Sequence, residues 1–409
     1  QERARILRVT AEGLSKGRED FARLIAEEAG KPIKAARAEV ERAIITFTLS
    51  AEEATRVEEE TLRINVPGAE PRRGMVRRFP SGPVAAITPF NFPLNLVAHK
   101  VAPAIACGCP VVLKPAPQTP LTALALAKLL HDAGLPPGAL QVLPLRNEDA
   151  APLSEDDRLK VLSFTGSAAV GWQLKARSGK KRVLLELGGN AAAIIHDDAD
   201  ISHAAARCAS GGFVYAGQSC ISVQRILVQE NVFQAFLDEL LRRVQALKCG
   251  DPLDESTDVG PLIRESDAVR VESWIKEAVG EGAKLLCGGG RNRSIVEPAV
   301  LTNTKPTQKV NCEEIFGPVV TVERYKTFDS ALKSANDSRY GLQAGVFTAD
   351  RGRIQRAFEE LEVGGVMVNE VPTFRADNMP YGGIKDSGLG REGVRYAIEE
   401  MTERKILVY

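Results

Sequence analysis

The stretch VLSFTGSAAVG at residues 161–171 combines a short, mostly apolar segment with a turn and the beginning of a helix. Its first four residues are mostly apolar and suit a strand that is buried on both faces of a sheet, and the Gly166-Ser167 turn leads into a helix that begins at Ala168. The same alternation of strand and helix continues on the N-terminal side, with strands expected at 84–87, 111–113 and 140–143 and a helix expected at 121–133. Such alternation predicts a doubly wound, Rossmann-like α/β domain.

The rhythm resumes beyond residue 190 and predicts a second α/β domain. Its strands are expected at 191–195, 225–228, 319–325 and 364–369. Residues 1–57 carry apolar side chains at helical spacing, interrupted at Gly30-Lys31-Pro32, so separate helices are expected there. Residues 61–80 alternate around a turn at Pro67-Gly68, which predicts a hairpin, and 405–409 predict a final strand.

The composition is that of a globular chain with no excess of either charge. Of 409 residues, 44% are hydrophobic, and 53 basic residues balance 53 acidic ones. This balance argues against nucleic acid or an acidic membrane as a partner. We interpret the basic run Arg72-Arg73 and Arg77-Arg78 as solvated strand edges. No apolar run reaches the roughly 18–20 residues of a membrane span, and no signal peptide is visible, although the chain begins inside an expected helix.

The seven cysteines are odd in number and irregular in spacing. This argues against a disulfide framework and for a reducing compartment, so a cytoplasmic location is expected. Cys107 and Cys109 have no second pair nearby, and the chain holds only four histidines, so no metal site is expected. We interpret these two cysteines as small, buried, apolar residues.

Cys220 is the candidate nucleophile. It lies in the run Gly217-Gln218-Ser219-Cys220-Ile221-Ser222. A thiolate is a strong nucleophile, and small neighbours leave the sulfur open to a planar carbonyl group. The alternative is a buried and inert thiol, which is the usual state of a lone cysteine among small residues.

Glu186 and Asn91 are candidates for a general base and an oxyanion donor. Glu186 stands between Leu185 and Leu187 at the end of an apolar strand, where burial would raise the pKa of its carboxyl and suit it to act as a base. Asn91 lies in Thr88-Pro89-Phe90-Asn91-Phe92-Pro93, a proline-fixed loop after a strand, where an amide can donate to an oxyanion. The alternatives are a glutamate bonded to backbone amides and an Asx-turn asparagine.

Three further motifs suggest a bound nucleotide. Lys114 ends a strand at the expected crevice, where an ammonium can bond ribose hydroxyls or phosphate. Thr165-Gly166-Ser167 leads from a strand into a helix whose first amides could hold a pyrophosphate. Glu314, in Glu313-Glu314-Ile315-Phe316-Gly317-Pro318, could accept hydrogen bonds from ribose hydroxyls. None of these is a GxGxxG motif, and each alone is weak evidence.

Together, the motifs resemble the aldehyde dehydrogenase superfamily in their order and spacing. The resemblance covers essentially the whole chain, although a few dozen N-terminal residues of that family are absent. It rests on these segments: Phe90-Asn91-Phe92-Pro93, Lys114-Pro115, Phe164-Thr165-Gly166-Ser167, Glu186-Leu187-Gly188-Gly189, Gly217-Gln218-Ser219-Cys220, Glu314-Ile315-Phe316-Gly317-Pro318 and Met379-Pro380-Tyr381-Gly382-Gly383-Ile384-Lys385-Asp386-Ser387-Gly388.

The resemblance implies a role for each matching residue. Cys220 would add to the aldehyde, Asn91 and the Cys220 backbone amide would hold the oxyanion, a hydride would pass to the nicotinamide, and Glu186 would activate the water that cleaves the thioester. The cofactor would be NAD or NADP. Its expected contacts are Thr88, Pro89, Phe90, Lys114, Pro117, Gly166, Ser167, Leu187, Gly188, Glu314 and Phe316.

The resemblance also implies the domain organisation. Residues 1–61 and 81–187 would form the cofactor-binding domain, and 188–385 the catalytic domain. Residues 62–80 and 402–409 would complete the sheet of a neighbouring subunit. A homodimer or homotetramer is therefore expected, with no nucleic acid or membrane partner.

Two departures from the family pattern bear on specificity. Many NAD-preferring members carry Glu where this chain has Pro117, and without that carboxylate NADP is not repelled. Ser219 replaces the arginine of phosphate-binding members, and His99 replaces an aromatic pocket residue. The pattern is most similar to lactaldehyde, phosphonoacetaldehyde and non-phosphorylating glyceraldehyde-3-phosphate dehydrogenases. We therefore expect a small polar or anionic aldehyde. Its expected contacts are His99, Ser219, Ile221, Arg375 and Tyr381.

Three alternatives stay open at this point. Arg375 could pair with Asp377 or Glu370 and merely order its loop. The chain could be a coenzyme A-acylating dehydrogenase, although Glu186 argues against this because a thiol acceptor needs a base less than water does. It could also be a non-catalytic protein that keeps the fold, although the retention of Cys220 and Asn91 argues against that.

Overall fold

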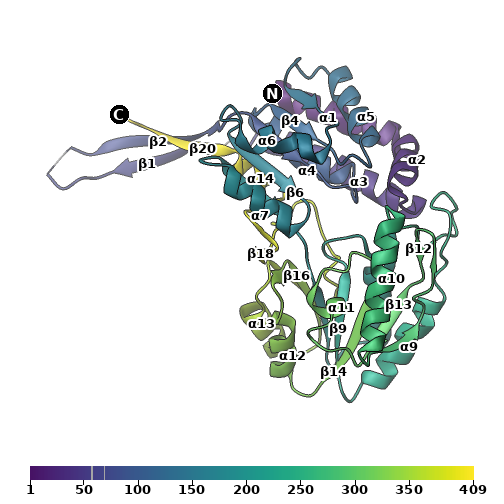
Figure 1. The fold of residues 1–409 in the computed structure, drawn as a ribbon. Coiled ribbons are helices and arrows are strands. Elements are labelled where there is room, and N and C mark those ends of the chain that lie inside the picture. The colour runs from purple at the N-terminus through teal and green to yellow at the C-terminus, as the bar shows by residue number, and fades with distance from the viewer. Residues whose placement is uncertain (57–58, 69) are drawn as a thin grey trace.

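The computed structural model describes residues 1–56, 59–68 and 70–409. It consists of two α/β units, one above the other in Figure 1, and a narrow sheet that projects from the upper unit. Residue 57, the expected end of the N-terminal helical region, lies outside the described residues.

The upper unit is built on a six-stranded sheet in the order β19-β7-β6-β3-β4-β5. All of its strands are parallel except the edge strand β19. The strands are β3 (Val84–Ile87), β4 (Val111–Lys114), β5 (Leu140–Val142), β6 (Val161–Thr165), β7 (Arg182–Glu186) and β19 (Gly388–Leu389). The chain runs outward from β3 in one direction and then, through β6 and β7, in the other. This confirms the doubly wound arrangement and leaves a crevice at the carboxyl ends of β3 and β6.

Helices cover both faces of this sheet because its strands are apolar on both. Val84 and Ala86 pack into the core beneath the N-terminal helices, while Ala85 and Ile87 pack on the opposite side with Leu153. The helices are α1 (Glu2–Lys16), α2 (Arg18–Ala29), α3 (Ile33–Glu53), α4 (Asn95–Cys107), α5 (Leu121–Asp132), α6 (Ala151–Glu155), α7 (Ala168–Arg177) and α14 (Val394–Glu400), with a 3₁₀ turn η1 (Asn147–Ala150). The predicted break at Gly30 is confirmed, since Gly30 ends α2 with a left-handed φ of 66°.

The lower unit holds a seven-stranded sheet in the order β10-β13-β14-β9-β8-β16-β17, in which only β10 is antiparallel to its neighbour. Its strands are β8 (Ala191–Ile195), β9 (Val223–Gln229), β10 (Lys284–Cys287), β13 (Ala299–Thr302), β14 (Val319–Tyr325), β16 (Gln343–Phe347) and β17 (Gly365–Val368). The second α/β prediction is thereby confirmed.

Helices also cover both faces of the lower sheet. They are α8 (Ile201–Phe213), α9 (Phe233–Gln245), α10 (Glu265–Gly280), α11 (Lys309–Cys312), α12 (Phe328–Asn336) and α13 (Arg351–Glu360). The remaining elements are small: η2 (Val214–Gly217), β11 (Arg291–Asn292) with β12 (Ile295–Val296), and β15 (Tyr340–Gly341) with β18 (Ile384–Lys385).

The projecting sheet is the predicted hairpin together with the final strand. β1 (Glu60–Ile64), β2 (Arg72–Pro80) and β20 (Thr402–Val408) lie side by side, with β20 paired along β2 from Thr402–Pro80 to Val408–Gly74. Four consecutive apolar residues at its end are exposed, and their exposed fractions range from 41% for Val408 to 63% for Tyr409.

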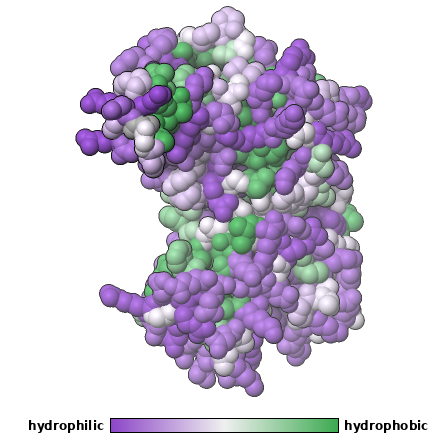
Figure 2. All heavy atoms as spheres, turned by 90° about the vertical axis from the view of Figure 1, so that its left-hand side faces the viewer, coloured by the Kyte–Doolittle hydropathy of each residue, from purple (hydrophilic) through white to green (hydrophobic). Residues whose placement is uncertain are grey.

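The two units are joined where their sheets meet. Residues 187–190 carry the chain from the end of β7 directly into β8, and β19 returns from the C-terminal region to pair with β7. Apolar side chains gather in the hollow between the units (Figure 2). Among the described residues, every helix is too short or too polar to serve as a membrane span.

Candidate active site

A cavity of about 410 Å³ lies between the two units and gathers residues from distant segments. The upper unit supplies Asn91 from the loop after β3 and Glu186 from the end of β7. The lower unit supplies Cys220 from the loop before β9 and Arg375 from the loop that follows β17. Of the residues predicted from the sequence, the following line this cavity: Pro89, Phe90, Asn91, Gly166, Ser167, Glu186, Leu187, Gly188, Ser219, Cys220, Ile221, Glu314, Phe316, Arg375 and Tyr381.

Cys220 sits in a loop shaped by an unusual backbone. Tyr215, Ala216 and Gly217 are three consecutive left-handed residues, and they redirect the chain between the end of α8 and β9. The Cys220 Sγ then lies 3.1 Å from the Tyr381 hydroxyl. Burial raises the pKa of Cys220 to about 12, and the Tyr381 hydrogen bond acts against this shift. A donor at this place favours the thiolate.

Glu186 is the buried carboxyl of the cavity, with 3% of its surface exposed. Burial raises its pKa well above the ordinary value, and the negative charge of Glu392 raises it further, while Arg375 and Lys100 oppose the shift. Its Oε2 has no hydrogen-bond partner among the described residues, so this oxygen is free to take a proton. These properties are those of a general base.

Asn91 is tied directly to the nucleophile loop. Its Nδ2 donates to the carbonyl oxygen of Gln218 over 3.0 Å, and Asn91 itself is 4% exposed. Gln218 stands two residues before Cys220, so this bond holds the Asn91 amide against the loop that carries the nucleophile. This position is compatible with the predicted oxyanion donor.

Behind Arg375, which lines the cavity, buried charged side chains form a chain of contacts. Glu392 accepts from Lys100 Nζ over 2.8 Å and from Arg375 Nη2 over 3.0 Å, and all three side chains are at most 6% exposed. Burial alone would raise the pKa of Glu392, but Lys100 and Arg375 lower it to about 2. Arg375 is thus held against the cavity by a partner that the sequence reasoning did not name, and the suggested pairing with Asp377 or Glu370 is wrong.

Asp377 and Glu370 have other partners. Asp377 accepts from Arg42 Nη2 over 2.8 Å and lies 2.7 Å from His99 Nε2, and Glu370 pairs with Arg207. His99 is 1% exposed and is not among the cavity-lining residues, so the structure does not bring it to the substrate position expected for it. Its fixed place in α4 points it into a buried network instead.

Sequence patterns did not predict three charged residues at or near the cavity, namely Lys100, Arg42 and Glu392. Lys100 could have been found, because it interrupts an otherwise apolar helix and a buried ammonium needs a partner. Arg42 and Glu392 carry no such signal, since both lie among other charged residues of their segments.

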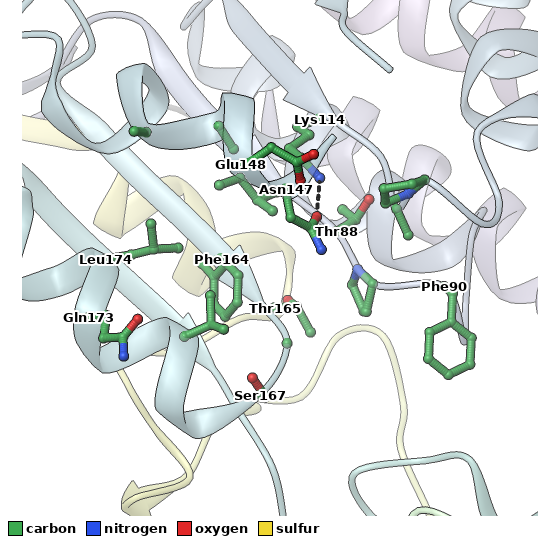
Figure 3. A pocket seen from close by; sticks show the side chains of 18 of the residues that line it. Thr88, Phe90, Lys114, Asn147, Glu148, Phe164, Thr165, Ser167, Gln173 and Leu174 are labelled. Carbon is green, nitrogen blue, oxygen red and sulfur yellow. Dashed lines mark hydrogen bonds between the residues drawn. The ribbon is translucent and has the colours of Figure 1, made fainter. Parts of the chain in front are cut away.

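A second hollow of about 450 Å³ follows the crevice of the upper sheet (Figure 3). It shares Pro89, Phe90 and Ser167 with the first cavity, so the two are continuous. Thr88, Lys114 and Pro117 line it as well, as predicted for cofactor contacts. Figure 3 shows Lys114 bonded to Asn147 on one side, with Thr165 and Ser167 across from them.

Several of these groups are left without partners, as a nucleotide site requires. Lys114 donates to Asn147 Oδ1 over 2.9 Å and forms no ion pair among the described residues. The buried Thr165 Oγ1 and Gln118 Oε1 likewise lack hydrogen-bond partners within the described part of the chain. Ser167 begins α7, where free helix amides attract phosphate. The residues present therefore fit a dinucleotide.

Glu314 and Phe316 lie where the hollow meets the cavity. Glu314 Oε1 accepts from the Gly189 N–H over 3.0 Å, and burial raises the pKa of Glu314 to about 7 despite this bond. Phe316 meets Phe90 edge to face, with 5.9 Å between ring centroids. Both side chains line the same cavity as Cys220.

Comparison with known proteins agrees with this geometry. The model of the aldehyde dehydrogenase family matches residues 1–407. The chain is 48% identical to a 3-sulfolactaldehyde dehydrogenase of Priestia aryabhattai over 409 residues, which are 100% of this chain and 86% of that protein.

Two solved structures are equally similar in fold. Aldehyde dehydrogenase 21 of Physcomitrella patens, in complex with its reaction product succinate, is 47% identical with a TM-score of 0.96 over 100% of this chain and 85% of the other. Glyceraldehyde-3-phosphate dehydrogenase GapN of Methanocaldococcus jannaschii, complexed with NADP, is 41% identical with a TM-score of 0.96 over 100% and 89% of the two chains.

Proposed function

The chain belongs to the aldehyde dehydrogenase family, and from this premise we propose that it oxidises a small anionic aldehyde to the carboxylic acid. Oxidation of small polar aldehydes with NAD or NADP is supported by its relatives. The residue roles, the anionic character of the substrate and the quaternary structure are the parts that we propose.

The proposed chemistry uses three side chains of the cavity. The Cys220 thiolate adds to the carbonyl carbon, and the Asn91 amide and the Cys220 backbone N–H donate to the oxygen that becomes negative. NAD or NADP, held by residues such as Lys114 and Ser167, would supply the hydride acceptor, and loss of the hydride leaves the acyl group on Cys220 as a thioester. Glu186 then takes a proton from water, which attacks the thioester and releases the acid and the thiol.

Arg375 is the observation that carries the anionic assignment. Its guanidinium is 6% exposed at the cavity wall, and its Nε has no partner among the described residues. Burial opposes its charge, but Glu392, Tyr381 and Glu186 raise the pKa of Arg375, so it stays positive. A buried cation with a spare donor in a small cavity favours a carboxylate, sulfonate or phosphate. Arg42 also lines the cavity, but its charge is balanced by Asp377.

The relatives support this assignment. The sulfo group of 3-sulfolactaldehyde and the carboxylates of succinate are both anionic. The experiment that tests it is a comparison of kcat/KM for 3-sulfolactaldehyde, succinic semialdehyde, lactaldehyde and hexanal in the wild type and in Arg375→Met. The variant should lose about 10–100-fold with the two anionic substrates, the range expected when a hydrogen bond to a charged group is lost, and far less with lactaldehyde.

The matched control is Arg207→Met, because Arg207 pairs with Glu370 on the outside of the lower unit. A wild-type preference for hexanal would remove the anionic assignment. If the product is a thioester of coenzyme A, the acyl group is transferred to that thiol and not to water, and the proposed hydrolysis is wrong.

We further propose the remaining assignments. Residues 1–61 and 81–187 bind the cofactor, and 188–385 supply the nucleophile. The sheet formed by 62–80 and 402–409 joins a second subunit into a homodimer or homotetramer, because exposed apolar strands such as β20 need a cover. All seven cysteines are free, which supports a cytoplasmic location.

A further inference from the structure

Lys31 occupies a place that the proposed chemistry does not explain. Its side chain is 1% exposed, and its ammonium pairs with the fully buried Glu39. Burial lowers the pKa of Lys31, and Glu39 opposes that shift. A buried ion pair adds little net stability, because desolvation costs about as much as the attraction returns. Its position next to the cavity therefore needs another reason.

The Lys31 ammonium lies between two aromatic rings that belong to the two catalytic loops. Nζ is 3.7 Å from the ring centroid of Phe92 and 4.5 Å from that of Tyr215. Phe92 follows Asn91 directly, and Tyr215 opens the left-handed turn that leads to Cys220. The two rings also meet edge to face at 6.4 Å. A desolvated cation attracts both ring faces and so draws the two loops together.

Glu39 extends this contact to the backbone of the first loop. Its Oε1 accepts from the N–H groups of Leu94 and Asn95 over 2.9 and 3.1 Å. These amides stand at the beginning of α4, three and four residues after Asn91. Through its carboxylate, the Lys31–Glu39 pair fixes the start of the helix that follows the Asn91 loop.

The second loop is fixed from the same side. The Tyr215 hydroxyl donates to the carbonyl oxygen of Ala29 over 2.9 Å, at the end of α2. Gln218, whose carbonyl accepts from Asn91, uses its side chain to bond Pro261 O and Ile263 N. Both catalytic loops are thus anchored around the turn between α2 and α3.

We propose that Lys31 is a positioning residue that clamps the loop of Asn91 against the loop of Cys220. The clamp sets the distance between the oxyanion donor and the nucleophile, which must act on the same carbonyl group. The inference rests on the proposed function, because it presupposes the proposed roles of Asn91 and Cys220. Lys31 itself is assigned no contact with substrate or cofactor.

The test is the double variant Lys31→Met/Glu39→Gln, which removes the cation without leaving a buried charge. The amide introduced by Glu39→Gln keeps an oxygen for the two N–H groups of α4. We expect kcat, divided by the folded fraction that near-ultraviolet circular dichroism measures, to fall about 10²-fold, the effect of a misplacement of about 1 Å. KM for the cofactor should stay unchanged. A protein that is merely unstable would lose activity in proportion to its folded fraction, which this ratio corrects for.

A wild-type kcat per folded chain in the double variant would overturn the clamp. If the double variant does not fold, Tyr215→Phe and Tyr215→Leu decide the question. The first loses only the bond to Ala29 and the second also loses the ring beside Lys31, so kcat of Tyr215→Leu should lie about tenfold or more below that of Tyr215→Phe; equal kcat in both would overturn the proposal. Lys175→Met is the matched control, since Lys175 lies 4.9 Å over Trp172 on the exposed face of α7. Activity that survives Cys220→Ala would remove the proposed function instead.

Discussion

The hydroxyl of Tyr381 lies 3.1 Å from the sulfur of Cys220, and the partly buried Cys220 packs against the buried cluster that contains Tyr381. Burial raises the pKa of both, but the hydrogen bond acts in opposite directions on the two, lowering that of Cys220 and raising that of Tyr381. Tyr381 therefore stays protonated and stabilises the thiolate.

Replacing Tyr381 with phenylalanine should slow the reaction of Cys220. Without the donor, the pKa of Cys220 rises, and the thiolate fraction at pH 8 falls by about tenfold, as expected for loss of a hydrogen bond to a charged group. The measurement is the rate of iodoacetamide alkylation against pH, with Tyr325→Phe as the control because that hydroxyl bonds Ile195 far from the cavity. An unchanged rate profile would show that Tyr381 does not tune the thiol.

The acidic limb of the pH profile should report Glu186. A base works only when deprotonated, so the raised pKa of Glu186 makes kcat increase with pH until that pKa is passed. Glu392→Gln removes a negative charge that raises this pKa and releases Lys100 and Arg375, which lower it. The limb should move to lower pH under conditions in which thioester hydrolysis limits kcat. Glu399→Gln is the control, because that side chain is 42% exposed and pairs with Arg395 on α14. A shift to higher pH in Glu392→Gln would contradict the assignment.

Gly188 and Gly189 should respond differently to alanine. A Cβ on Gly189 would lie 2.1 Å from the Cys220 carbonyl oxygen, a backbone atom that cannot yield without moving the nucleophile. A Cβ on Gly188 would meet the Glu314 carboxylate at 2.4 Å, the end of a side chain that can rotate away. Gly189→Ala should lower kcat by about 10²-fold, and Gly188→Ala should mainly raise KM for the cofactor. Steady-state kinetics separates the two, and equal effects would contradict the geometry.

Pro117→Glu should change the preference between the two cofactors. Pro117 lines the hollow beside Lys114, and a carboxylate there would repel the 2′-phosphate of NADP. KM for NADP should rise about tenfold or more, because like charges at close range cost more than about 1.4 kcal/mol, whereas KM for NAD should change little. Gln173→Glu, on the opposite wall, serves as the control. If the ratio of KM for NADP to KM for NAD does not change, the 2′-phosphate of NADP does not bind near residue 117.

A charge on the projecting strand should disrupt assembly. Leu407 is 55% exposed at the end of β20, and an aspartate there would be desolvated in any subunit interface. Sedimentation velocity should show Leu407→Asp as a smaller species than the wild type. Lys405→Asp, on the same strand, tests whether charge reversal alone has this effect. A wild type that already sediments as a monomer would remove the oligomer proposal.

Local patterns in the sequence predicted both α/β domains, but not the strands β10, β13 and β16 of the lower sheet. Strands 191–195 and 319–325 have the predicted bounds. The first is a continuous apolar run and the second is mainly apolar at its start, and such patterns depend on the strand's own residues. The left-handed turn at Tyr215 and Ala216 could not be predicted, since neither residue favours that conformation and only the surrounding packing holds it.

The candidate site was predictable only in part. Cys220, Glu186 and Asn91 stand in short motifs and do line one cavity. Arg375 was found, but its partner Glu392 was not, because a charge in an exposed-looking segment reveals nothing of a contact made across the fold. His99 was misplaced for a related reason: its helix position gave no sign that Asp377 would draw it into the interior.

The edge strand β19 brings Gly388 beside Glu186 and Leu389 beside Leu185. It also brings Glu392 to Lys100, so the upper unit takes essential parts from both ends of the chain. When only residues 1–187 have been synthesised, β7, which carries Glu186, lacks its edge strand β19. The ammonium of Lys100 then also lacks its partner Glu392. Vectorial synthesis therefore cannot complete this unit first. Residues 1–187 can therefore reach the fold described above only after residues 388–392 have been synthesised.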